Sequence, residues 1–329
     1  MKDILERLFN YQRLDKSEAY EVLKRIGEGA YNPSQITAFL TAYQMRPVTV
    51  DELTGFRDAL LDLCIPVDLS DFDAMDLCGT GGDGKDTFNI STISSFVVAG
   101  AGIKVAKHGN YGVSSSCGSS NVIEHLGYQF TDNADTLRQQ IDTAGICFLH
   151  APKFHPAMKH VGGIRRELGV KTFFNMLGPM VNPSRPQKQL VGVFSLELAR
   201  LYNYLYQRSD KQYVILHSLD GYDEISLTGS FKAITSEQEV MHSPESIGLR
   251  RLEASELFGG KTVEEAGRIF TAVLSNEGTD AQMEVVCANA GAALQCAEPE
   301  LSIEDSIATA RESIESGNAI SSFKKLLAA

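Results

Sequence analysis

The sequence predicts an α/β protein in which a small all-helical domain precedes a larger α/β domain with a mostly parallel central sheet. Residues 1 to about 65 carry only helical patterns, whereas from about residue 75 short apolar strands alternate with helices. Such alternation is typical of a parallel sheet covered by helices. The chain of 329 residues is long enough for two domains or for one large one. We therefore expect a helical domain over residues 1–66 and an α/β domain over residues 74–329.

Three helix starts define the helical domain. Each combines a capping side chain with a residue suited to the first turn: Asp15 with Glu18, Asn32 with Pro33, and Thr49 with Glu52. Apolar residues recur at helical spacing after the third start, at Leu53, Phe56, Ala59, Leu60 and Leu63. The N-terminal stretch MKDILERLFNYQRLD is an amphipathic helix pattern without an apolar signal core. A short acidic connector, IPVDLSDFDA, leads to the second domain.

The α/β domain is predicted from strands that enter glycine-rich or polar loops. DAMDLCGTGG indicates a strand with a glycine loop, and ISTISSFVVAGAG indicates the helix that follows it. GIKVAKHGN indicates a second strand and loop, followed by a helix around SSNVIEHLG. ICFLHA and QYVILHSLDG are typical of further buried strands, and DSIATARESIESG of a late helix. Ligands of parallel sheets bind beyond the carboxyl ends of the strands, where these loops lie.

Composition and charge exclude several classes of function. The formal net charge is −12, which opposes non-specific binding to nucleic acid or to an anionic membrane. No segment approaches a membrane span. The six cysteines are scattered without a C-x-x-C pair, which argues against a zinc site or a disulfide framework and favours a cytoplasmic location. An acidic enzyme that handles anions must gather positive charge locally or use a metal cation.

The stretch GTGGDGKDTFNIST, residues 79–92, comes close to the nucleotide-binding loop G-x-x-x-x-G-K-[ST]. Gly79, Gly84 and Lys85 fit that pattern. The hydroxyl that would hold Mg²⁺ in such a loop is replaced by Asp86. The stretch is therefore not expected to bind ATP in that manner.

The same stretch has the chemistry of a different phosphate cradle. A phosphate needs clustered backbone N–H donors and close approach without a Cβ atom. Four glycines supply the approach: Gly79, Gly81, Gly82 and Gly84. Three side chains are suited to capping the next helix and to donating to an oxygen-rich ligand: Asn89, Ser91 and Thr92. For the glycines alone, an ordinary turn between strand and helix explains the pattern equally well.

A second polar cluster, KHGNYGVSSSCGSS, covers residues 107–120. Lys107 adds a positive charge, and His108 and Asn110 add directed donors. The loop from Ser114 to Ser120 is rich in hydroxyl groups. Single histidines and serine-rich loops are usually structural or solvated, but two such loops after predicted strands indicate a site for a polyphosphate or a sugar phosphate.

Two charged pairs complete the candidate site. Asp223 and Glu224 lie in DGYDEISLTG at the end of a predicted strand. Adjacent carboxylates of this kind are often an ordinary acidic turn, but beside a polyphosphate they are suited to Mg²⁺, which takes one or two carboxylates plus waters and substrate oxygens. Arg165 and Arg166 form either a solvated helix face or a bidentate clamp for a substrate carboxylate. Spacing alone leaves these alternatives open.

Taken in order, these motifs resemble the anthranilate phosphoribosyltransferase family over nearly the whole chain. The matching segments are GTGGD at 79–83, TFNIST at 87–92, VAKHGN at 105–110, HPAMKHV at 155–161, RRELGVKTFFNMLGP at 165–179 and DEISLTG at 223–229. The resemblance implies transfer of the phosphoribosyl group of phosphoribosyl pyrophosphate (PRPP) to the amine of anthranilate, with release of pyrophosphate, in tryptophan biosynthesis. It also implies a nucleoside phosphorylase/phosphoribosyltransferase-like fold with Mg²⁺ as cofactor.

The resemblance assigns roles residue by residue. Those implied for PRPP are Gly79, Gly81, Gly82, Asp83, Thr87, Asn89, Ser91, Thr92, Lys107 and Ser119. Those implied for anthranilate are Gly79, His108, Asn110, His155, Arg165 and Gly178, with Arg165 as the carboxylate partner. Those implied for the metal are Ser91, Asp223 and Glu224. No general acid or base is assigned, because an aromatic amine is neutral at pH 7 and already carries a lone pair.

The resemblance also implies how the domains are built. The helical domain would take in residues of about 165–185 discontinuously, and two chains would pair through it as a homodimer. The chain departs from the family at two places. The family usually has Arg after KHGN, where this chain has Tyr111. The family usually has the segment G-S-A-D-V-L-E further on, where this chain differs from Ser120 to Glu124.

Two rival functions remain from other classes. A pyrimidine nucleoside phosphorylase-like enzyme would use inorganic phosphate, without pyrophosphate or Mg²⁺; Asp223 with Glu224 and the order GTGGD…TFNIST favour the transferase. A non-catalytic relative that binds nucleic acid would need a broad basic surface, which the acidic balance opposes.

Overall fold

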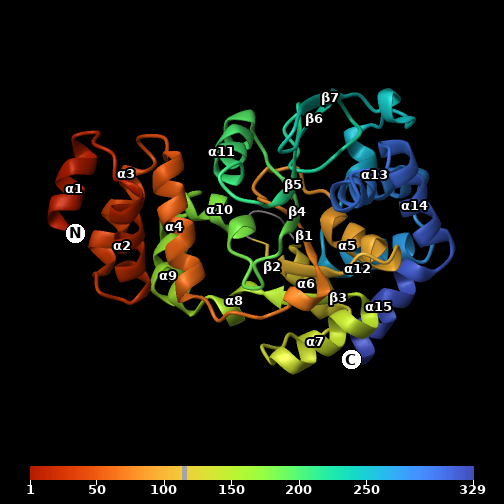
Figure 1. Ribbon diagram of the computed structural model, residues 1–329, viewed down its shortest axis with the longest axis horizontal. Helices are drawn as coiled ribbons and strands as arrows, with labels where there is room; N and C mark the ends of the chain where they lie inside the picture. Colours follow the sequence, from red (N-terminus) through yellow and green to blue (C-terminus); the bar gives the residue numbers. More distant parts are fainter. Residues whose placement is uncertain (113–116) are drawn as a thin grey trace. The chain divides into compact units, whose positions relative to one another are not determined.

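The computed structural model describes residues 1–112 and 117–329, and the chain divides into two compact units. The helical unit comprises Met1–Val67 and Ala151–Arg185, and the sheet unit comprises Asp68–His150 and Pro186–Ala329. Figure 1 shows that the first contains only helices and that the strands belong to the second. The predicted combination of an all-helical part with a mostly parallel α/β part is confirmed.

The three predicted helix starts are present in the helical unit. Its elements are α1 Lys2–Phe9, α2 Lys16–Gly27, α3 Pro33–Ala42, α4 Val50–Leu63, α8 Ala151–Phe154, α9 Lys159–Leu168 and α10 Phe174–Leu177, with 3₁₀ turns η2 Pro156–Met158 and η3 Gly178–Met180. The side chains of Asp15, Asn32 and Thr49 each accept a hydrogen bond from the third residue of α2, α3 and α4. The helix starts could be predicted because caps are local chemistry.

An aromatic cluster holds the returning segment in the helical unit. The Phe173 ring stacks on the Phe56 ring with centroids 4.5 Å apart, and it meets the Phe39 ring edge-on at 6.0 Å. The return begins at Ala151 rather than near residue 165, because α8 is tied to the end of α4. The Ile65 N–H donates to the Phe154 carbonyl at 2.8 Å.

The sheet unit contains a seven-stranded sheet in the order β3-β2-β1-β4-β5-β6-β7. Its strands are β1 Met75–Gly79, β2 Val105–Gly109, β3 Ile146–His150, β4 Lys188–Gly192, β5 Gln212–Ser218, β6 Phe231–Ile234 and β7 Glu239–His242. The five strands from β3 to β5 in this order are parallel, and β6 and β7 join antiparallel at one edge. The parallel part places the carboxyl ends of β1, β2 and β5 along one edge of the sheet.

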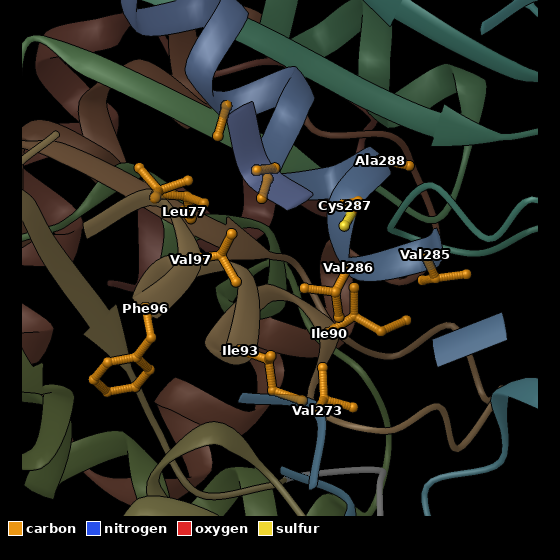
Figure 2. Packing of buried hydrophobic residues seen from close by; sticks show 14 of the residues in the cluster. Leu77, Ile90, Ile93, Phe96, Val97, Val273, Val285, Val286, Cys287 and Ala288 are labelled. Carbon is orange, nitrogen blue, oxygen red and sulfur yellow. The ribbon is translucent and has the colours of Figure 1, made fainter. Parts of the chain in front are cut away.

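Helices of the sheet unit bury its core. They are α5 Ile90–Gly100, α6 Ser119–His125, α7 Ala134–Ala144, α11 Leu196–Tyr206, α12 Val263–Leu274, α13 Asp280–Ala297, α14 Ile303–Glu315 and α15 Asn318–Ala328, with 3₁₀ turns η1 Ser70–Phe72, η4 Glu245–Ile247 and η5 Ala254–Leu257. Figure 2 shows Ile90, Ile93 and Val97 of α5 in the same apolar cluster as Val286 and Cys287 of α13. Helices that are buried on most sides have almost continuously apolar sequences, as α5 and α13 do.

The described parts of the chain contain no helix that combines the length and the apolarity needed for a membrane span.

Candidate functional site

The glycine loop after β1 is folded around the carboxylate of Asp223. The Gly81 N–H donates to Asp223 Oδ2 at 2.6 Å. A Cβ atom at Gly79 would lie only 2.3 Å from the same oxygen, so this position requires glycine. Gly81, Gly82 and Gly84 have φ values of 66°, 78° and 72°, which side chains rarely adopt. Gly79 is therefore required by a close approach, and Gly81, Gly82 and Gly84 by their backbone conformation.

Glu224 meets the other end of the same stretch, at the first turn of α5. The Ser91 N–H donates to Glu224 Oε1 at 2.9 Å, and the Thr87 hydroxyl donates to Oε2 at 3.5 Å. A helix N-terminus is a favourable place for a negative charge. The structure thus brings together the glycine loop, the start of α5 and both carboxylates of the DEISLTG segment.

These carboxylates lie in an environment that disfavours their own negative charge. Burial, helped by the negative charge of Asp83, raises the pKa of Asp223 to about 7. Burial raises the pKa of Glu224 well above its ordinary range, and the charges of Asp223 and Asp83 add to the effect. A bound cation would relieve this repulsion. Within residues 1–112 and 117–329, no group of three or more His, Cys, Asp or Glu side chains is arranged as a metal cage. Two carboxylates suit Mg²⁺, which is usually held by one or two carboxylates together with water and substrate oxygens.

Lys107 lies below the strand ends and not on the open surface of the cluster. Its side chain is 1% exposed, and its ammonium donates to the Leu77 carbonyl at 2.5 Å. Burial lowers the pKa of Lys107, and the charge of Asp76 opposes that effect. His108 is also buried, and its backbone N–H donates to Asp76 Oδ1 at 3.1 Å. The predicted positive charge of Lys107 is thus present, but it is buried beneath the strand ends, where it acts on Glu224.

The two polar loops are joined by side chains. Asn89 occupies the N-cap position of α5, but its side chain makes no capping bond, which corrects the expected capping role. Its Nδ2 instead donates to the Cys117 carbonyl at 3.1 Å. The Ser119 hydroxyl donates to the carbonyl of Asn110, an exposed residue, at 3.2 Å. Thr92 is buried in the first turn of α5. Ser114, Ser115 and Ser116 of the expected hydroxyl-rich loop lie outside the described residues.

Tyr111 stands at the position where the family that the sequence resembles usually has arginine. It contacts Glu124 and His150. Its hydroxyl lies 3.2 Å from both carboxylate oxygens of Glu124. Its ring meets the His150 ring edge-on at 4.8 Å. Tyr111 thus anchors the start of the segment after β2 to α6, without a positive charge.

In the helical unit, the structure separates the two arginines. Arg166 is exposed, whereas Arg165 is partly buried and its Nη2 donates to Asn175 Oδ1 at 3.1 Å. The Arg165 guanidinium lies over the Phe174 ring, 5.4 Å from its centroid. Its buried Nε finds no hydrogen-bond acceptor among the residues described, and burial lowers its pKa. A desolvated guanidinium with an unused donor is suited to a ligand carboxylate, so the clamp is favoured over the solvated face.

Two further residues expected to contact anthranilate, His155 and Gly178, also lie in the helical unit. His155 is buried at the start of η2. A Cβ atom at Gly178 would meet no heavy atom of the described chain within 4 Å, so the backbone there is open to an approaching group.

Asn289 of α13 positions the segment that carries Asp223 and Glu224, and it was missed from the sequence. Its side chain accepts from the Ile225 N–H at 3.0 Å and donates to the Ile225 carbonyl at 2.8 Å. Ile225 directly follows Glu224. The sequence offered one indication of this role, a single amide side chain in the apolar run VVCANAGAAL. A buried amide needs hydrogen-bond partners.

We expect Asn289→Ala to lower the free energy of unfolding by about 2–4 kcal/mol, because it leaves both backbone groups of Ile225 unsatisfied. Urea denaturation measures this. Gln295→Ala on the same helix removes one 3.3 Å bond to the Leu301 carbonyl and should cost less than about 1 kcal/mol. Equal losses in the two variants would contradict the role of Asn289.

A second anchor holds the far side of the glycine loop. The Phe88 N–H donates to the Leu257 carbonyl at 3.1 Å, and the Gly259 N–H donates to the Asp86 carbonyl at 2.9 Å. Thr87 and Phe258 form an isolated antiparallel bridge between these bonds. The residues that make this contact are far apart in sequence, so no local pattern predicts it.

Two family models match the chain. A glycosyl transferase family helical bundle domain matches residues 2–64, and a glycosyl transferase family a/b domain matches residues 71–320. The anthranilate phosphoribosyltransferase of Flavobacterium johnsoniae is 61% identical over 326 residues, covering 99% of this chain and 98% of the relative. That of Cytophaga hutchinsonii is 58% identical over 325 residues, covering 99% of both.

Solved structures are similar over the same length. Anthranilate phosphoribosyltransferase from Thermus thermophilus matches with a TM-score of 0.92 and 32% identity, covering 98% of each chain. The Saccharomyces cerevisiae enzyme in complex with PRPP and Mg matches with a TM-score of 0.90 and 28% identity, covering 98% of this chain and 96% of the other. The same yeast enzyme in complex with 4-fluoroanthranilate matches with a TM-score of 0.88 and 27% identity, covering 98% and 95%.

Proposed function

This chain belongs to the anthranilate phosphoribosyltransferase family, and from that premise we propose how its residues carry out the family's reaction. It transfers the phosphoribosyl group of PRPP to the amine of anthranilate, giving N-(5-phosphoribosyl)anthranilate and pyrophosphate in tryptophan biosynthesis. The observation that supports the site most directly is the pair Asp223 and Glu224, clasped by Gly81 and Ser91.

In the transfer, the amine nitrogen forms a bond to the anomeric carbon of the ribose. The bond from that carbon to pyrophosphate breaks, its electron pair stays on the pyrophosphate oxygen, and the nitrogen releases a proton to water or to the pyrophosphate. Asp223 and Glu224 would hold Mg²⁺, with Ser91 beside them, and the bound cation would supply positive charge for the departing pyrophosphate. The glycine loop from Gly79 to Asp83 lines the phosphates, as do Thr87, Asn89, Thr92 and Ser119. Lys107 adds positive charge from beneath the strands.

Anthranilate is recognised mainly through its carboxylate. Arg165 takes that carboxylate through the guanidinium edge that has an unused Nε donor. Of the other residues proposed for anthranilate, His155 and Gly178 belong to the helical unit, and Gly79, His108 and Asn110 belong to the sheet unit. Positioning the neutral amine near the anomeric carbon supplies much of the rate, so no strong general base is needed.

The protein acts as a homodimer that pairs through its helical unit. Three large apolar side chains support this, because they are exposed there: Phe9 at 58%, Tyr11 at 70% and Met45 at 72%. Light scattering after gel filtration tests it: a mass of twice 35.9 kDa is expected, and a monomer would exclude it. The six cysteines are buried free thiols, which supports a place in the reducing cytoplasm.

The decisive test of the reaction is anthranilate fluorescence in purified protein. We expect a loss of fluorescence that requires both PRPP and Mg²⁺. Fluorescence that persists in a folded sample would overturn the proposal, and phosphorolysis of pyrimidine nucleosides would then test the phosphorylase alternative. A filter-binding assay with a salt titration separates the nucleic-acid-binding alternative.

We expect Mg²⁺ to bind more tightly as the pH rises from 6 to 8, by about tenfold overall. The pKa of Asp223 is raised to about 7, so below that pH Mg²⁺ must displace a proton and above it the carboxylate is already charged. Isothermal titration calorimetry in two buffers of different ionisation enthalpy measures both the affinity and the released proton. An affinity independent of pH would refute the assignment of Asp223.

A further inference from the structure

Lys85 is the one feature of the near-match to a nucleotide-binding loop that the site described above leaves unused. It is exposed and lies between Gly84 and Asp86, whose φ values are 72° and 49°. The Lys85 N–H donates to Asp83 Oδ1 at 3.2 Å, which closes a tight turn. The lysine is therefore presented at the tip of the glycine loop by a defined backbone.

The backbone that carries Lys85 is anchored on both sides. On one side the Gly81 N–H binds Asp223 at 2.6 Å. On the other side the Asp86 carbonyl accepts from the Gly259 N–H at 2.9 Å. A side chain on such a loop reaches a fixed region, even though its own stem is flexible.

The side chain of Lys85 lies against the segment that bears the metal-site carboxylates. Its Nζ is 4.6 Å from the centroid of the Tyr222 ring. Tyr222 is 5% exposed and directly precedes Asp223. A Cβ atom at Gly221 would lie 3.6 Å from Lys85 Cε, so the stem packs along this turn. A cation–π contact of an exposed ammonium is weak, so the Lys85 ammonium can leave it at little cost.

We propose that Lys85 binds the pyrophosphoryl group of PRPP and the pyrophosphate that leaves, an inference that rests on the proposed function. The site faces this highly negative group with three carboxylates of its own, from Asp83, Asp223 and Glu224. The Lys107 ammonium is committed to the Leu77 carbonyl beneath the strands. Lys85 is a cation on the cradle loop itself, held by a ring and not by a carboxylate, so it turns to a phosphate oxygen without breaking an ion pair.

The experiment compares Lys85→Met with Lys324→Met, a matched exposed lysine on α15 of the same unit. We expect Lys85→Met to raise the KM for PRPP and the inhibition constant of pyrophosphate about tenfold each, and to change the KM for anthranilate less than twofold. Lys85→Arg should restore both constants to within about threefold of wild type. Lys324→Met should leave all three unchanged.

Calorimetric binding of inorganic pyrophosphate with Mg²⁺ provides a readout that does not need turnover. Weaker binding of pyrophosphate to Lys85→Met than to wild type supports the proposal. This holds even if the wild-type protein fails to consume anthranilate, because that failure would overturn only the proposed reaction. Equal pyrophosphate binding would overturn the role of Lys85. So would equal increases in the KM values of PRPP and anthranilate, because these would indicate a distorted loop. Melting temperatures, also recorded for Lys85→Ala, confirm that the variants are folded.

Discussion

Replacing Asp223 with Asn and Glu224 with Gln together is expected to reduce Mg²⁺-dependent turnover by roughly 10³-fold or more, because several kcal/mol of charge stabilisation on the leaving group depends on the metal. The amides keep the size of the side chains and still accept from Gly81 and Ser91. They lack the charge that binds Mg²⁺. Steady-state rates across a Mg²⁺ titration measure the effect.

The same double variant should keep or raise its melting temperature. Burial and mutual repulsion raise the pKa values of both carboxylates, so at pH 8 each contributes less stability in its charged form than a neutral isostere would. Asp86→Asn is the control: it is exposed on the same loop, and its φ of 49° suits asparagine. Loss of activity with a stable fold assigns the carboxylates to the reaction, whereas full activity in the double variant would remove the metal assignment.

The local parts of the fold were predictable from the sequence because their signals are local. Asp15, Asn32 and Thr49 cap their helices as predicted, since a cap involves residues three positions apart. Strand β4, Lys188–Gly192, was not predicted although it lies between β1 and β5 in the sheet. Only Leu190 and Val191 of its five residues are large and apolar, and its burial comes from neighbours distant in sequence. The family resemblance implied a return of the chain at about residue 165, whereas the helical unit takes in Ala151–Arg185.

The site shows the same division. Glycine-rich spacing and paired carboxylates predicted which segments meet, and the family to which they point is confirmed. Spacing does not reveal that Gly192 must lack a Cβ atom, which would lie 1.5 Å from the Asp223 carbonyl. Nor does it reveal that Asn289 clamps Ile225 from another helix. These are contacts through space, and only the folded chain defines them.

Replacing Arg165 with Ala should raise the KM for anthranilate by roughly 100-fold, while the KM for PRPP changes by about threefold or less. Removing one partner of a partly buried charge pair costs about 2–5 kcal/mol, because the carboxylate is left desolvated without a donor. Arg166→Ala is the matched control: it removes the same charge from the next position of α9, on a side chain that is exposed. Initial rates with each substrate varied in turn separate the two KM values.

The pattern across variants decides what Arg165 does. Arg165→Lys keeps the charge but loses the planar fork and the Nε donor, so it should recover only part of the anthranilate affinity. A purely structural role, through Asn175 and Phe174, would instead lower the melting temperature and raise both KM values together. Equal increases for anthranilate and PRPP would remove the clamp from this mechanism. A selective increase would establish that the unused donor of a desolvated guanidinium is the carboxylate receptor.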